Sequence, residues 1–127
     1  MTISAEKMEL YRETARRRAA RQKAELDARF GCAWRTARSA AQLLKENFSA
    51  KRVVVFGSLV NRKLFHTRSD IDLAVWGISE NQYFAALSAI LDVDPQFSVD
   101  LVRMEDIYGE ESRIALVKTI EQEGREL

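Results

Sequence analysis

Apolar residues in the first third of the chain recur at the spacing of a helix. The segment before Gly31 has no glycine or proline, and its apolar positions include Met8, Tyr11, Ala15, Ala19 and Leu26. This pattern predicts a helix over about 1–30 with a narrow apolar stripe, which packs along one seam, for instance against another chain. We expect Gly31 to end this helix and a second helix to continue to Phe48.

After residue 50 the pattern becomes that of strands. Residues 53–56 form a β-branched run typical of a buried strand, and residues 70–76 alternate polar and apolar side chains. Residues 97–102 alternate in the same way. The sequence therefore predicts three strands.

Two further helices are predicted among and after these strands. Ser79 and Gln82 have the spacing of a capping box, which predicts a helix to about residue 91. Its inward-facing side chains would be Phe84, Leu87 and Leu91. A last helix is expected over about 110–123, with Gly124 as its cap.

The order of these elements predicts the fold class α/β (α+β). We expect a small mixed sheet of three or more strands packed by helices, preceded by a long N-terminal helix. The length of 127 residues suits a single domain, 1–127. Within it, residues 1–48 would form an N-terminal helical arm and packing helix, and residues 49–127 the core.

Composition restricts the class of protein further. Hydrophobic residues make up 46% and charged residues 31%, as in soluble globular proteins. No apolar run approaches the ~18 residues of a membrane span, and charges occupy the place of a signal peptide's apolar stretch. We therefore expect a cytoplasmic protein with no membrane partner. The single Cys32 excludes an internal disulfide.

Charge is distributed unevenly along the chain. Residues 1–50 hold 11 Lys/Arg and 6 Asp/Glu, a net of +5, whereas residues 51–127 hold 9 and 13, a net of −4. This asymmetry suggests two surfaces with different roles. The total of +1 gives little counterion-release affinity, so nucleic acid is not expected as the main ligand.

Three aspartates occupy strand positions that rarely carry acids. Asp70 and Asp72 are two residues apart, so their side chains project from one face of the strand. Asp100 lies between apolar neighbours in the third predicted strand. If these strands are neighbours, the carboxylates converge and need cations to balance their charge. Such oxygen donors suit Mg²⁺ (or Mn²⁺), which predicts a catalytic metal site at Asp70, Asp72 and Asp100.

A candidate phosphate site follows the first predicted strand. Gly57 lets the backbone approach a ligand closely, and its N–H with the Ser58 hydroxyl can hold a phosphate. The next loop contains Arg62, Lys63 and Arg68, whose charge suits a polyphosphate. A phosphate site beside two carboxylate-bound metal ions is the arrangement needed for in-line phosphoryl or nucleotidyl transfer.

Together these residues resemble the DNA-polymerase-β-type nucleotidyltransferase superfamily. Its pattern of Gly-Ser, Asp-x-Asp and a third acid on a later strand is matched by Gly57-Ser58, Asp70-Ile71-Asp72 and Asp100. Because little chain lies beyond this core, the sequence is similar to the minimal nucleotidyltransferases (MNT). These are typically antitoxins paired with HEPN-domain ribonuclease toxins. The resemblance covers residues 51–102 well and residues 103–127 in outline.

The resemblance implies a specific activity. MNT antitoxins transfer AMP from ATP to a tyrosine of the cognate HEPN toxin, which silences its RNase activity. By the same resemblance, Asp70 and Asp72 would coordinate two Mg²⁺ ions, and Asp100 would bind the catalytic ion and help to deprotonate the tyrosine. Gly57 and Ser58 would hold the triphosphate of ATP.

Two alternatives remain open at this point. The chain could transfer a nucleotide to a small molecule, as aminoglycoside-type nucleotidyltransferases do. It could also be a non-catalytic module that neutralises a toxin by contact through its arginine-rich first helix, which contains Arg16, Arg17, Arg18 and Arg21.

Overall fold

The computed structural model describes residues 4–127, and within them a four-stranded mixed sheet forms the centre. The strands are β1 (Arg52–Phe56), β2 (Ile71–Trp76), β3 (Val99–Arg103) and β4 (Arg125–Glu126), in the order β3-β2-β1-β4. β1 is antiparallel to β2 and β4, whereas β2 and β3 are parallel. The predicted class is confirmed, and β4 adds a strand that the sequence pattern did not indicate.

Helix α1 (Ala5–Asn47) is continuous, so the predicted end at Gly31 is wrong. A glycine ends a helix when it adopts a left-handed conformation, and Gly31 is not among the glycines with positive φ. The buried Ala33 and Ala37 pack beyond it and offset its low helix propensity of about 1 kcal/mol. The first three residues of the predicted helix lie outside the described residues. Across the part described, no helix has the length and apolar character needed to cross a membrane.

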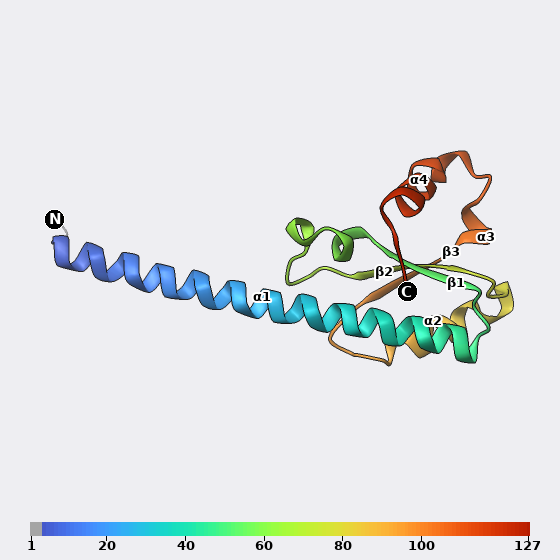
Figure 1. Cartoon of the computed structure of the whole chain (residues 1–127), viewed down its shortest axis with the longest axis horizontal. Helices are drawn as coiled ribbons and strands as arrows, with labels where there is room; N and C mark the ends of the chain where they lie inside the picture. Colours follow the sequence, from blue (N-terminus) through green and yellow to red (C-terminus); the bar gives the residue numbers. More distant parts are fainter. Residues whose placement is uncertain (1–3) are drawn as a thin grey trace.

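The remaining helices lie on both faces of the sheet (Figure 1). α2 (Tyr83–Leu91) and the C-terminal half of α1 cover one face, and α3 (Met104–Ile107) and α4 (Ile114–Glu123) cover the other. Short 3₁₀ turns connect these elements: η1 (Gly57–Val60), η2 (Arg62–Leu64), η3 (Glu80–Gln82) and η4 (Glu111–Arg113). The sheet is therefore packed between two helical layers.

The inward face of α2 differs in part from the predicted one, although Leu87 packs against the core as predicted. Ala86 and Ile90 are fully buried, whereas Phe84 is 79% exposed and Leu91 is also exposed. The Ser79 side chain does not cap the helix but donates a hydrogen bond to Gln82 Oε1 (3.2 Å). Ala86 and Ile90 are four residues apart and therefore share the face of α2 that packs against the core.

Candidate active site

Two of the predicted acids lie opposite each other on neighbouring strands. Asp72 of β2 pairs in register with Asp100 of β3, while Ile71 and Leu73 point into the core on the other face. Asp70 is exposed and lies immediately before β2 rather than within it. The parallel pairing of β2 and β3 thus brings Asp72 and Asp100 together at one end of the sheet.

The Asp72 carboxyl has a strongly shifted pKa. The pKa is raised from 3.8 to about 6, mainly by burial and further by the negative charges of Asp100 and Asp70. A hydrogen bond between the Asp72 and Asp100 carboxyl groups makes a smaller contribution to the same shift. Because the pKa of Asp72 is raised, this carboxyl group favours a bound proton or a bound cation.

Gly57 provides the space for this carboxylate. Its φ is +76°, and a Cβ atom at this position would lie 2.3 Å from Asp72 Oδ2. Any side chain here would therefore collide with Asp72 and would also adopt a left-handed backbone conformation that only glycine accepts readily. The end of β1 at Gly57 and the Asp72 carboxylate are therefore packed directly against each other and form one unit of the site.

Two hollows adjoin this unit. One, of about 350 Å³, is lined by Asp72 and Asp100 together with Tyr83, Leu87 and Leu116. The other, of about 500 Å³, is lined by residues that include Gly57, Ser58, Asn61, Thr119 and Arg125. We call the first the acid hollow and the second the glycine–serine hollow.

The three basic residues predicted to contact phosphate lie outside the lining of both hollows. Arg62 forms an ion pair with Asp27 of α1, and its guanidinium lies 5.3 Å from the centre of the Phe30 ring. The Lys63 side chain and Arg68 are exposed on the η2 turn and the loop that follows it. Arg62 thus fastens η2 to α1, and a phosphate-binding role for the three remains a prediction.

Two residues near the site were not predicted from the sequence. Arg125, which lines the glycine–serine hollow, lies on β4 opposite Val55, and a two-residue strand has no periodic pattern to reveal it. Tyr83 borders the acid hollow and donates a hydrogen bond to the Leu101 carbonyl oxygen (2.5 Å). Burial and the nearby Asp100 raise the pKa of the Tyr83 hydroxyl.

The acids are compatible with magnesium. Mg²⁺ is usually bound by one or two carboxylates, with substrate phosphates and water completing its coordination. Asp72 and Asp100 supply such a pair, and Asp70 is near enough for its charge to act on Asp72. Within residues 4–127, no three His, Cys, Asp or Glu side chains come close enough to complete a metal site unaided. The arrangement therefore fits a metal ion that is held jointly by protein and nucleotide.

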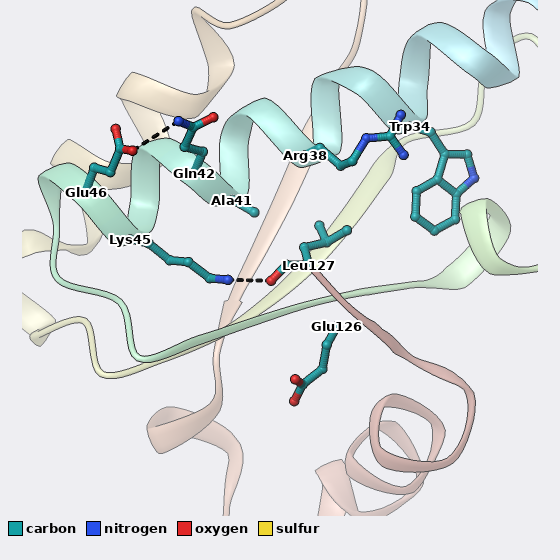
Figure 2. A pocket seen from close by; sticks show the side chains of 8 residues that line it. All are labelled: Trp34, Arg38, Ala41, Gln42, Lys45, Glu46, Glu126 and Leu127. Carbon is teal, nitrogen blue, oxygen red and sulfur yellow. Dashed lines mark hydrogen bonds between the residues drawn. The ribbon is translucent and has the colours of Figure 1, made fainter.

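A separate hollow of about 540 Å³ lies between the C-terminal half of α1 and the end of β4 (Figure 2). Trp34, Ala41 and Leu127 form part of its lining, and the Lys45 ammonium group donates a hydrogen bond to the Leu127 carbonyl oxygen. It contains neither the aspartates nor Gly57 and Ser58. The geometry gives it no part in the candidate active site.

Comparison with known proteins relates this geometry to a family. Residues 39–127 match the family model described as "Polymerase beta, Nucleotidyltransferase". No curated protein matches the sequence. Two solved structures have a similar fold: a mutant of the toxin–antitoxin MntA–HpeT (18% identity, TM-score 0.54) and a toxin–antitoxin with AMP-PNP (20% identity, TM-score 0.55). Each similarity covers 71% of this chain and 70% of the other.

Proposed function

Because the chain belongs to the Polymerase beta nucleotidyltransferase family, we propose that it transfers AMP from ATP to a tyrosine of a HEPN-type ribonuclease toxin and thereby acts as an antitoxin. The observation that carries this proposal is the register of β2 and β3, which sets Asp72 opposite Asp100 beside Gly57. Two carboxylates next to a glycine–serine turn suit the binding of a metal-complexed triphosphate.

The structural neighbours support the choice of substrate and partner. Both are toxin–antitoxin structures, and one was solved with AMP-PNP, an analogue of ATP. The other carries glutamate in place of two aspartates that are two positions apart, the spacing of Asp70 and Asp72 here. We therefore propose ATP as the nucleotide and a toxin protein as the acceptor.

Asp70, Asp72 and Asp100 would hold magnesium, which when bound supplies positive charge to the phosphate oxygens and polarises the acceptor hydroxyl. Each carboxylate has a distinct position for this task. Asp72 is the half-buried centre of the group, and Asp100 faces the acid hollow. Asp70, at the exposed entrance of β2, adds its charge from the side.

The glycine–serine hollow is the proposed site of the triphosphate. The Ser58 hydroxyl and the backbone at Gly57 can donate hydrogen bonds to phosphate oxygens, and Arg125 adds positive charge. Asn61 and Thr119 add further polar groups to the same lining. The α-phosphate would then lie near Asp72, because Gly57 is in direct contact with that carboxylate.

The acid hollow is the proposed site of the acceptor tyrosine. Its walls include Leu87 and Leu116, which offer an apolar surface to a phenol ring, and Asp100 lies within reach of a hydroxyl group placed there. In the reaction, the phenolic oxygen attacks the α-phosphorus of ATP and the bond to the bridging oxygen of the β-phosphate breaks. Pyrophosphate leaves with that electron pair, and the Asp100 carboxylate accepts the phenolic proton.

The direct test uses ATP labelled at the α-phosphate, magnesium, and the protein encoded by the adjacent reading frame. We expect label on a tyrosine of that protein, release of pyrophosphate, and no transfer from ATP labelled at the γ-phosphate. Asp72→Asn and Asp100→Asn should each lower transfer by about a thousandfold, whereas Asp92→Asn, which changes an exposed acid at the end of α2, should leave it unchanged. Label found only on small hydroxylated acceptors would instead favour an aminoglycoside-type activity, and no label on any acceptor would refute the proposal.

A further inference from the structure

The N-terminal half of α1 projects from the rest of the molecule (Figure 1). Every residue from 4 to 25 is exposed, whereas from Leu26 onwards the helix packs against the sheet. We call residues 4–25 the projecting segment. At 1.5 Å per residue it extends for about 30 Å.

The apolar stripe of the packed half continues along the projecting segment. In the packed half, Ala33, Ala37, Ala40 and Leu44 are buried at intervals of three or four residues. Counting back from Ala33 at the same intervals gives Phe30 and Leu26, then positions 22, 19, 15, 11 and 8, which are apolar except for Gln22. Because this spacing keeps residues on one side of a helix, the exposed stripe faces the same side as the sheet.

Basic side chains border this stripe. Between residues 5 and 25 there are seven Lys/Arg and four Glu. Glu9 is close to Arg12 and Arg16, and Glu13 pairs with Arg17 on the back of the helix. Arg18 and Lys23 lie on either side of the stripe and form no ion pair within residues 4–127. The stripe is thus apolar at its centre and basic at its edges.

The projecting segment begins next to the point where η2 contacts α1. Arg62 of η2 is anchored there by Asp27 and Phe30, and η2 follows directly on η1 with Gly57 and Ser58. A protein bound to the stripe would therefore lie beside η2, on the same side of α1 as the sheet.

We propose that the projecting segment is the docking surface for the acceptor protein, through a face of that protein that is apolar at its centre and acidic at its rim. This inference rests on the proposed function. Charge complementarity favours this occupant over a second copy of the chain, because two copies would bring Arg18 and Lys23 against like charges. The four glutamates make the segment a poorer match for an RNA backbone than a uniformly basic helix would be.

Two double variants with the same change of charge test the inference. Arg18→Glu with Lys23→Glu reverses the edges of the stripe, and Arg17→Glu with Arg21→Glu reverses the far side. Glutamate has nearly the helix propensity of Arg and Lys, so circular dichroism should be unchanged in both. Binding to the protein of the adjacent reading frame is measured by isothermal titration calorimetry, and binding of ATP with magnesium is measured separately.

We expect the stripe-edge variant to bind that protein about tenfold or more weakly, with a smaller dependence on salt, and the far-side variant to bind as the parent does. ATP binding should be equal in all three proteins. Equal losses in both variants, unchanged binding in both, or no binding by the parent would overturn the inference. Dimers lost in the stripe-edge variant would assign the surface to a second copy, and salt-sensitive binding of single-stranded RNA lost in both would assign it to RNA. Because ATP binding is scored separately, failure of the docking surface is distinguishable from failure of the nucleotidyltransferase activity.

Discussion

The two faces of the sheet carry different kinds of residue although they share the same strands. On β2, Ile71, Leu73 and Val75 are 0% exposed beneath α1 and α2. Asp72 lies on the opposite face, half-buried and next to Asp100. Because strand side chains alternate with a period of two, one strand can stabilise the fold on one face and carry chemistry on the other. Substitutions one residue apart should therefore have separable effects.

The two faces are also covered to different extents. The face under α1 and α2 belongs to the larger core cluster, whereas the other has a smaller cluster built around Val54, Phe56 and Ala74 with Met104, Ile107 and Ile120. α3 and α4 cover that smaller cluster and leave the acid hollow open beside it. Incomplete cover on this face is what keeps the carboxylates accessible to a ligand.

The largest expected effect concerns activity on the open face. Asp72→Asn should lower the rate of AMP transfer by about a thousandfold, equivalent to about 4 kcal/mol, because it removes a charged oxygen donor from the site. The free energy of unfolding at neutral pH should not fall, since the carboxylate is destabilised there. Transfer rates and urea unfolding measured on one preparation check this. A loss of stability equal to that of a core variant would show that the two faces are not independent.

The covered face should respond in the opposite manner. Leu73→Ala should lower the free energy of unfolding by about 3 kcal/mol, because it leaves a cavity beneath α1 and α2. The transfer rate per folded molecule should remain close to that of the parent. Phe84→Ala is the control, because this side chain is 79% exposed and its removal should change stability by less than about 0.5 kcal/mol. Urea denaturation of the three proteins makes the comparison.

Gly57 lies at the end of β1 and next to the Asp72 carboxylate, so its substitution should lower both the stability of the fold and the rate of transfer. Gly57→Ala should destabilise the fold by about 2 kcal/mol, because it strains a left-handed backbone and displaces the Asp72 carboxylate. Gly109→Ala is a matched control: its φ is +87°, but no atom lies within 4 Å of the added Cβ. If both variants lost the same stability and both kept activity, the close approach of Gly57 to Asp72 would not be needed for stability or for transfer.

The smallest expected effect is a dependence of stability on pH. The folded protein holds a proton on Asp72 up to a pKa of about 6, whereas the unfolded chain releases it near 3.8. Stability from this group is therefore greatest below pH 4 and declines as pH rises through 6. Because Asp72 is only partly buried, we expect its contribution to the free energy of unfolding to fall by about 1 kcal/mol from pH 4.5 to pH 7.5 in the absence of metal.

Comparing the parent with Asp72→Asn across that range isolates this contribution from those of other groups. The asparagine variant should have a flatter profile, and magnesium should reduce the difference by favouring the charged carboxylate. Parallel profiles for the two proteins in EDTA would contradict the assignment.

Much of the central sheet was predictable from local pattern alone. The β-branched run ending at Phe56 and the alternation from Ile71 to Trp76 both correspond to observed strands. The sequence does not reveal that β2 and β3 are neighbours, because tertiary packing decides which strands pair. The convergence of Asp72 and Asp100 therefore depends on a pairing that only the structure shows. β4 could not be predicted, since a two-residue strand is defined by its partner rather than by its own sequence.

The helical errors have a common physical cause. The signals at Gly31 and Ser79 are purely local, but Gly31 is followed by helix residues that pack against the sheet, and the Ser79 hydroxyl bonds to Gln82 instead of capping a helix. The basic loop illustrates the same limit for the site. Arg62 has the right charge for phosphate, yet its pairing with Asp27 depends on a contact between segments that sequence spacing does not reveal.

The placement of Arg125 has a consequence for the synthesis of the protein. Gly57, Ser58 and all three aspartates precede it in the chain, yet the glycine–serine hollow has its full lining only after β4 joins β1. During translation the acids, Gly57 and Ser58 therefore emerge from the ribosome well before Arg125, which completes the lining of the glycine–serine hollow. If this hollow binds the triphosphate as proposed, we expect AMP transfer to begin only once β4 has been added to the sheet.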